Sequence, residues 1–163
     1  MVVKRKVKHN WLGMALVSLL AVSCTGNEVF FHYRPVDVGG WNKDSLCVFD
    51  IPVNDTASAY DMYVNVRNRS EYPYQNLWLF MQEMLPDSTI RTDSIELYLA
   101  DQRGKWLGAG VGAVKEMPVL YRRNFHFHQK GTYHYRIGHG MRDSLLKGVN
   151  DIGMKVEKAR DVK

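Results

Sequence analysis

Tyr60-Asp61-Met62-Tyr63-Val64-Asn65-Val66-Arg67 alternates between apolar and polar side chains along its length. In an extended chain Met62, Val64 and Val66 share one face, while the polar residues and Tyr63 share the other. A strand with one apolar and one polar face is typical of an antiparallel sheet that covers a core on one side only. The segment therefore predicts a half-buried antiparallel strand.

Short apolar or alternating runs recur on both sides of this segment, separated by turn residues. Further strands are expected at 29–33, 46–51, 77–84, 94–99, 125–128, 132–137 and 151–157. The run at 77–84 begins almost wholly apolar, which predicts a central strand covered on both faces, with Trp78 in the core. The segment 125–128 is expected to form a hairpin with 132–137. One short helical turn is expected within 141–147.

The spacing of these runs, roughly 8–12 residues with no long amphipathic helix between them, decides between fold classes. It favours an all-β fold, a single antiparallel β-sandwich of the jelly-roll kind, over βαβ units. We expect this domain to cover residues 29–158, followed by a polar tail at 159–163. Gly108, Gly110 and Gly112 leave one face of an expected strand without side chains, which allows a bulge or the close approach of another backbone.

The N-terminus has the features of an export signal. A basic run, Lys4-Arg5-Lys6-Val7-Lys8, precedes an apolar core of about 12 residues, which is too short to span a bilayer. Leu20-Ala21-Val22-Ser23-Cys24 resembles the lipobox of bacterial lipoproteins, although Ala21 stands where that box usually has Leu. This resemblance implies cleavage before Cys24 and acylation of Cys24, so that residues 1–23 are a lipoprotein signal peptide and residues 24–28 a short linker. A soluble cleavage site and an uncleaved anchor are the alternatives.

The charge balance excludes one class of partner. Four of the 22 basic residues lie in the signal, and the remaining chain has 18 basic against 17 acidic residues. A nucleic-acid interface needs a clustered basic surface, so no nucleic acid is expected as a partner. With Cys24 acylated, Cys47 has no disulfide partner, and its apolar surroundings predict a buried small side chain.

Three histidines are candidate metal ligands: His126, His128 and His134. The expected hairpin would bring them to one face, and imidazole is a good ligand for zinc or copper. The simpler interpretation is a polar outer face over an inner face of Phe125, Phe127, Tyr133 and Tyr135. We therefore expect no metal and no cofactor. The chain also lacks the Gly-x-Ser-x-Gly turn of many serine hydrolases.

Aromatic residues suggest a carbohydrate-binding alternative. Trp41 and Trp106 adjoin expected loops and are candidates for exposed rings that stack on sugars. The competing interpretation is core packing, in which aromatic side chains bury large areas.

Several segments resemble the gliding-motility lipoprotein family GldH in their order and spacing. The segments are Trp41-Asn42-Lys43, Arg67-Asn68-Arg69-Ser70-Glu71-Tyr72-Pro73-Tyr74-Gln75-Asn76-Leu77-Trp78-Leu79-Phe80, Gly104 to Glu116, and Gly131-Thr132-Tyr133 with the stretch from Met141 to Lys158. The resemblance implies an outer-membrane lipoprotein associated with gliding machinery and its secretion system. It implies no reaction and no catalytic residues.

Three functions therefore remain open. The first is a non-enzymatic envelope protein, periplasm-facing, that docks other gliding or secretion proteins through sheet edges and aromatic loops, including Trp41, Tyr72 and Tyr74. The second is a lipid-anchored carbohydrate-binding module. The third is a metal-binding accessory protein that uses the histidines.

Overall fold

The computed structural model describes residues 27–160, which form only strands, turns and loops. In this range no helix exists that could cross a bilayer. The strands are β1 (Glu28–Pro35), β2 (Trp41–Asn42), β3 (Cys47–Val53), β4 (Tyr60–Arg69), β5 (Asn76–Met84), β6 (Ile90–Tyr98), β7 (Val114–Phe125), β8 (Gly131–His139), β9 (Leu145–Leu146) and β10 (Val149–Lys158). The expected signal peptide, Cys24 and the end of the tail lie outside the described residues.

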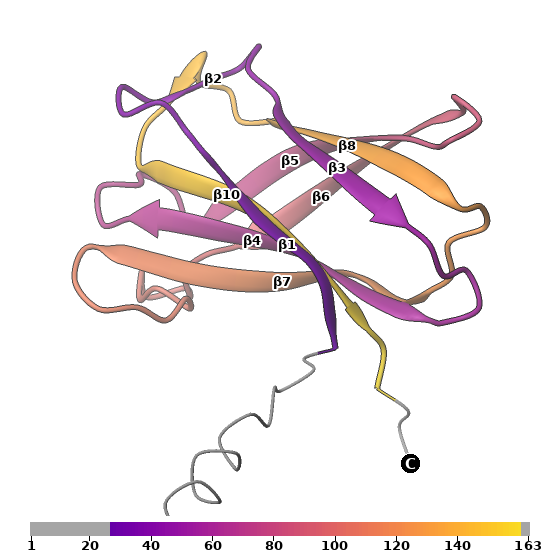
Figure 1. Ribbon diagram of the computed structural model, residues 1–163. Coiled ribbons are helices and arrows are strands. Elements are labelled where there is room, and N and C mark those ends of the chain that lie inside the picture. The colour runs from indigo at the N-terminus through magenta and orange to yellow at the C-terminus, as the bar shows by residue number, and fades with distance from the viewer. Residues whose placement is uncertain (1–26, 161–163) are drawn as a thin grey trace, which may run out of the picture.

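The eight long strands form two antiparallel four-stranded sheets. Sheet I has the order β1-β10-β4-β7, and sheet II has the order β3-β8-β5-β6. The strands pair as though one long hairpin had been wound up, since β1 pairs with β10, β3 with β8, β4 with β7 and β5 with β6. This is the order of a jelly roll, and it confirms the expected all-β sandwich. Figure 1 shows the two layers, with β2 and β9 pairing at one corner.

The alternation in β4 sets the position of the core. Met62, Val64 and Val66 are each 0% exposed and face sheet II, where Phe49 and Leu79 are equally buried. Inward-facing residues of both sheets belong to one apolar cluster. Burial of apolar surface, which stabilises the folded state by about 25 cal/mol per Å², is the main driving force for such a sandwich.

Proline marks three of the four outer edges of the two sheets. Pro35 lies in β1, Pro118 in β7 and Pro52 in β3, and all three strands are edge strands. Proline has no backbone N–H to donate, so it is tolerated at an edge and discourages pairing with another strand. The fourth edge strand, β6, has no proline and instead carries the charged residues Arg91 and Asp93.

The predicted hairpin between 125–128 and 132–137 is wrong. β7 ends at Phe125 in sheet I, and β8 begins at Gly131 in sheet II, so the chain crosses between the sheets at 126–130. Alternation shows which side chains share a face of a strand, but it does not show to which sheet the strand belongs. Among the described long strands, the consecutive pair that forms a hairpin is β5 and β6. The expected helical turn at 141–147 is also wrong, since this segment contains turns and β9.

The glycine-spaced segment forms a loop after β6 and not a strand. Its backbone nevertheless makes the close approach that the glycines predict. A Cβ atom on Gly108 would lie 2.8 Å from the carbonyl oxygen of Glu116, and one on Gly110 would lie 2.4 Å from that of Val114. Either contact is too short for a side chain, so glycine is required where the loop folds against the start of β7.

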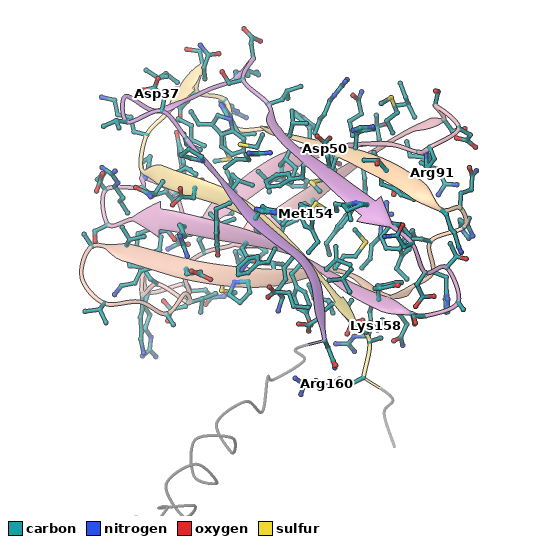
Figure 2. All side chains as sticks on the ribbon, in the orientation of Figure 1. Asp37, Asp50, Arg91, Met154, Lys158 and Arg160 are labelled. Atoms are coloured by element: carbon teal, nitrogen blue, oxygen red, sulfur yellow. The ribbon has the colours of Figure 1, made fainter. Side chains whose placement is uncertain are left out.

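The sandwich has two distinct ends. We call the end where β1 begins and β10 finishes the proximal end; there Glu28 pairs with Glu157. Lys158 and Arg160 lie at this lower end of the view, whereas Asp37 lies at the opposite, distal end (Figure 2). The loops 70–75, 99–113 and 140–148 meet at the distal end, joined by backbone bonds such as Ser70 to Ala113 and Gly140 to Trp78.

Candidate functional site

The outer face of sheet II carries large aromatic side chains into solvent. In β5, Leu77, Leu79 and Met81 are buried, whereas the intervening Trp78 and Phe80 are 40% and 55% exposed. The prediction that both faces of this strand are covered, with Trp78 in the core, is therefore wrong. Neither layer of the sandwich packs over this face, so two large rings remain in contact with water.

A groove of about 590 Å³ forms beside these rings. It is lined by Tyr74, Trp78, Phe80, Ser94, Gly140, Met141 and Arg142. The volume falls within the roughly 300–1,000 Å³ typical of sites that take a small molecule or a few side chains. We call this feature the distal groove, because β5 starts at the distal loop 70–75.

Glycine in and after β8 keeps the groove open. A Cβ atom on Gly140 would lie 3.0 Å from the Phe80 ring, and one on Gly138 would lie 2.9 Å from Leu46. Phe80 also borders a second hollow of about 320 Å³, which Leu46 and Arg136 help to line. The apolar surface thus continues across sheet II from Trp78 to Leu46, which is 52% exposed.

Around this surface the carboxylates have hydrogen-bond partners, whereas two arginines have no carboxylate partner. The side chain of Tyr74 donates a 2.6 Å hydrogen bond to Asp143, and Glu96 accepts hydrogen bonds from Asn76 and Tyr98. Arg142 and Arg136 have no carboxylate partner among residues 27–160; Arg136 donates only to the neutral Gln82. Asp93 lies in the hollow with Arg136 but accepts hydrogen bonds from the backbone N–H of Ser94 and from Tyr121. The rim of the apolar surface therefore has two arginines that form no ion pair within the described residues.

The two tyrosines of the expected aromatic loop have different roles. Tyr72 is 4% exposed and donates to the carbonyl oxygen of Asn76 at 2.8 Å, so it packs the distal end internally. Burial raises the pKa of the Tyr72 hydroxyl well above its ordinary value. Tyr74 is 36% exposed and forms one wall of the groove. Of these two, only Tyr74 is placed to meet a partner.

Trp41 and Trp106 do not form the exposed platform that their loop positions suggested. Trp41 is 2% exposed, donates from Nε1 to the carbonyl oxygen of Ser45 at 2.9 Å, and packs against His139. Trp106 is half-buried, with its ring 6.4 Å from that of Tyr72. Trp41 therefore follows the competing interpretation, core packing, since it belongs to β2, which pairs with β9 at the corner of the sandwich.

The three candidate histidines lie in separate surroundings. His134, on the outer face of β8, contacts Asp50 of β3 at 2.6 Å. His126 and His128 are exposed in the crossing between the sheets, His126 next to Asn124 and Lys158 and His128 near Phe125. Within the described range no three histidine, cysteine or acidic side chains gather in a way that could hold a metal. The three histidines do not converge, because the hairpin that would bring them to one face does not form.

Cys47 occupies the place that the sequence predicts for it. It is 7% exposed in β3, and burial raises the pKa of its thiol to about 11. A protonated, enclosed thiol is a poor nucleophile. Cys24 lies outside the described residues, so its acylation stays a prediction.

Sequence reasoning missed the outward-facing pair in β5, although the signal was present. Trp78 and Phe80 are two residues apart, as are Leu77 and Leu79, so the run contains two apolar rows. Such a run fits a strand covered on both sides, and it equally fits a strand with one row in the core and one row on an open surface. Only the layer count of the sandwich separates the two.

Comparisons with known proteins agree on one family. The sequence model of the GldH lipoprotein family matches residues 28–156. A "Gliding motility lipoprotein GldH homolog" of Christiangramia forsetii is 33% identical over 148 residues, covering 86% of this chain and 90% of that protein. A "Gliding motility lipoprotein GldH" of Flavobacterium johnsoniae is 32% identical over 160 residues, covering 94% and 98% of the two chains.

Proposed function

The chain belongs to the GldH lipoprotein family, and on this basis we propose that it is a lipid-anchored, non-enzymatic docking protein of the gliding machinery. Its role is to hold envelope proteins of that machinery, and of the secretion system associated with it, at the membrane. The sandwich supplies a rigid surface, and acylated Cys24 supplies the attachment. Three acyl chains make such attachment effectively permanent, since one chain alone binds only marginally.

We place the protein at the outer membrane with its domain facing the periplasm. The support is the export signal with its lipobox-like Cys24 and the short polar stretch that follows it. The acidic run that often follows the cysteine in surface-exported lipoproteins of related bacteria is missing from residues 25–28. These are sequence observations, and fractionation of the envelope tests them directly.

The observation that carries the docking proposal is the outward-facing pair Trp78 and Phe80. Contact between two large apolar rings and water is unfavourable, and burial of the rings against a partner would be favourable. Exposed apolar patches of this kind mark interaction sites. Aromatic residues and arginine are enriched where proteins bind one another. The distal groove combines both kinds of residue on a rigid sheet, which is suited to binding with little loss of conformational freedom.

The lining of the groove favours binding over reaction. Among its lining residues Ser94 has the only aliphatic hydroxyl, and no histidine lies beside it to act as a base. Nucleophilic catalysis needs such a base within hydrogen-bonding reach of the nucleophile. This chemistry is why we propose a docking surface and no active site.

A second candidate is the lipid-anchored carbohydrate-binding module. It is favoured by the same two rings, because residues i and i+2 of a strand project side by side about 7 Å apart and could stack on a sugar. Binding to insoluble cell-wall and surface polysaccharides separates the candidates. Retention of the protein on polysaccharide that depends on Trp78 would favour this second function.

The test of the first function is genetic. A strain lacking the gene should lose surface spreading, and the unaltered gene should restore it. The Trp78→Ser, Phe80→Ser double variant should accumulate in the membrane fraction at normal level and fail to restore spreading. The matched control is Val111→Ser, because Val111 is a fully exposed apolar residue of a distal loop that does not line the groove. Normal spreading without the gene would contradict the proposal.

A further inference from the structure

We infer that the distal groove takes a segment of another envelope protein that inserts an aromatic or aliphatic side chain beside Trp78 and Phe80 and sets carboxylates against Arg142 and Arg136. The inference rests on the proposed docking function and adds to it the location and the chemistry of the contact. It follows from the shape, the charge and the position of the groove.

The apolar part of the contact is set by the groove itself. The rings of Tyr74, Trp78 and Phe80 line it together with the side chain of Met141. Met141 accepts a hydrogen bond from the backbone N–H of Trp78 at 3.4 Å from its sulfur, which fixes the thioether against β5. A flat or branched apolar side chain that entered here would exclude water from all four residues. Binding energy in protein interfaces concentrates at such desolvated aromatic pockets.

The polar part of the contact is set by the two unpaired cations. Arg142 lines the groove and Arg136 lines the adjoining hollow, on either side of Phe80. Three nearby carboxylates already accept hydrogen bonds: Asp143 from Tyr74, Glu96 from Asn76, and Asp93, which lines the same hollow as Arg136, from the backbone N–H of Ser94. A guanidinium forms two parallel hydrogen bonds with a carboxylate, so each arginine is complementary to an Asp or Glu of the partner. The spacing of the cations about an apolar centre predicts an apolar side chain flanked by acidic ones.

The position of the groove excludes the anchoring membrane as the occupant. β4 runs from Tyr60, opposite Lys158 at the proximal end, to Arg69 at the distal end, about 30 Å away for a ten-residue strand. Trp78 lies three residues into β5, which starts at the distal end. The chain enters β1 at the proximal end, so acyl chains on Cys24 would hold that end at the bilayer and direct the groove away from it.

A partner with acidic side chains suits the groove better than a second copy of this chain does. Two copies meeting through this face would enclose the Arg136 and Arg142 side chains of both copies in one interface. Like charges in an interface oppose association, so an acidic partner is favoured over self-association.

The test is photo-crosslinking of the full-length acylated protein in its own cells. p-Benzoylphenylalanine at position 80 keeps a ring in the groove and forms a covalent adduct with what contacts it. We expect an adduct with a peptide of one envelope protein that carries an aromatic or aliphatic residue within three positions of an Asp or Glu. The same residue at position 111 should not form this adduct.

Charge variants give the second readout. Arg142→Glu with Arg136→Glu should lower the yield of the adduct at least fivefold, and Arg142→Lys with Arg136→Lys should keep most of it. Arg103→Glu, at an exposed distal position outside the groove, is the matched control and should leave the yield unchanged. All variants are compared at equal abundance in the membrane fraction.

Several results would overturn the inference: an adduct with lipid, glycan or a second copy, no adduct, equal adducts at positions 80 and 111, or a yield indifferent to charge reversal. The proposed function fails in a different way, since it fails if the strain lacking the gene spreads normally. A strain that needs the gene but whose protein crosslinks elsewhere would retain the function and refute this site.

Discussion

The carboxylate of Glu83 on β5 accepts hydrogen bonds from both terminal nitrogens of Arg122 on β7, at 3.1 and 3.0 Å, so the two sheets are joined by an ion pair across the core. The side chain of Glu83 is 3% exposed, and the hydroxyl of Tyr135 also donates to it. Burial, the largest single influence, lowers the pKa of Arg122, but the hydrogen bond to Glu83 and the electrostatic interactions with Tyr135, Tyr121 and Glu83 together outweigh burial and raise it. The guanidinium also lies over the rings of Tyr121 and Phe125.

Removal of one partner of this pair should be costly. We expect Glu83→Ala to lower the free energy of unfolding by about 3–5 kcal/mol, because it leaves the Arg122 charge enclosed without a counter-ion. Glu157→Ala removes a partly exposed carboxylate paired with Lys155 and should cost about 1 kcal/mol or less. Urea denaturation of the full chain measures both. Equal costs for the two variants would contradict the role assigned to Glu83.

Gly153 should not tolerate a side chain while Tyr33 is present. The ring of Tyr33 lies over Gly153, and a Cβ atom there would be 2.6 Å from Tyr33 Cε1. The ring is held by Arg67, whose guanidinium carbon is 3.7 Å from its centroid, and by a hydrogen bond from Asn65. Gly153→Ala should cost about 1–3 kcal/mol of stability. Its cost should fall by at least half in a Tyr33→Ala background, and an unchanged cost in this double-mutant cycle would show that the ring is not the obstacle.

Trp41 and Trp78 should respond to substitution in opposite ways. Trp41→Ala should lower the free energy of unfolding by about 3–5 kcal/mol, because it empties a buried site next to His139. Trp78→Ser should change it by about 0.5 kcal/mol or less, because the ring is on an open face, while abolishing partner crosslinking. Denaturation and crosslinking on the same preparations give both values. A large loss of stability for Trp78→Ser would place that ring in the core.

The count of reactive thiols tests acylation of Cys24 together with the burial of Cys47. At pH 8 the native protein should react slowly with a thiol reagent, because burial raises the pKa of Cys47 to about 11 and shields its sulfur. In denaturant one thiol per chain should react if Cys24 is acylated, and two if it is not. Cys24→Ser is the control, with one thiol in either case. Rapid reaction of the native protein would contradict the enclosed position of Cys47.

Stability should depend on pH through His139. Burial lowers the pKa of this histidine, and its Nε2 contacts the carbonyl oxygen of Trp41 at 3.0 Å. The unfolded chain therefore binds the proton more readily than the native protein does. Stability should be full above about pH 6.5 and should fall as the pH drops through the lower, native pKa. His139→Gln should lessen this dependence; an identical pH profile for the variant would rule out His139 as its source.

Much of the fold could be predicted from alternation alone. The period-two pattern in β4 identifies Met62, Val64 and Val66 as core residues, and the structure confirms all three. Alternation is local, however, and the strand partners of a jelly roll are not. β1 pairs with β10 from the other end of the chain, and no pattern within either strand identifies the other. This is why the pairing of β7 with β8 was predicted wrongly.

The candidate site could be predicted less well. Whether a side chain is exposed depends on how many layers pack over its strand, and the sequence does not show that number. Trp41 adjoins a loop yet is buried as part of the short β2–β9 pair, while Trp78 lies in the most apolar strand yet faces outward. Glu83 appeared as a single carboxylate in an apolar strand, and its partner Arg122 is 39 residues away. The histidines illustrate the reverse case, since the possible cluster disappears once His134 lies in β8 and the other two lie in the crossing between the sheets.

The arrangement of the ends of the sandwich has a practical consequence for labelling the protein. β1 begins and β10 ends at the same pole of the sandwich. A fluorescent protein or epitope fused after Lys163 would therefore be attached on the side where the chain enters β1. Such a fusion would lie between that pole and the membrane to which the acyl chains would attach it, and it would leave the opposite pole accessible. An insertion beside Val111, an exposed residue of a distal loop that does not line the groove, would instead carry a reporter at that opposite pole.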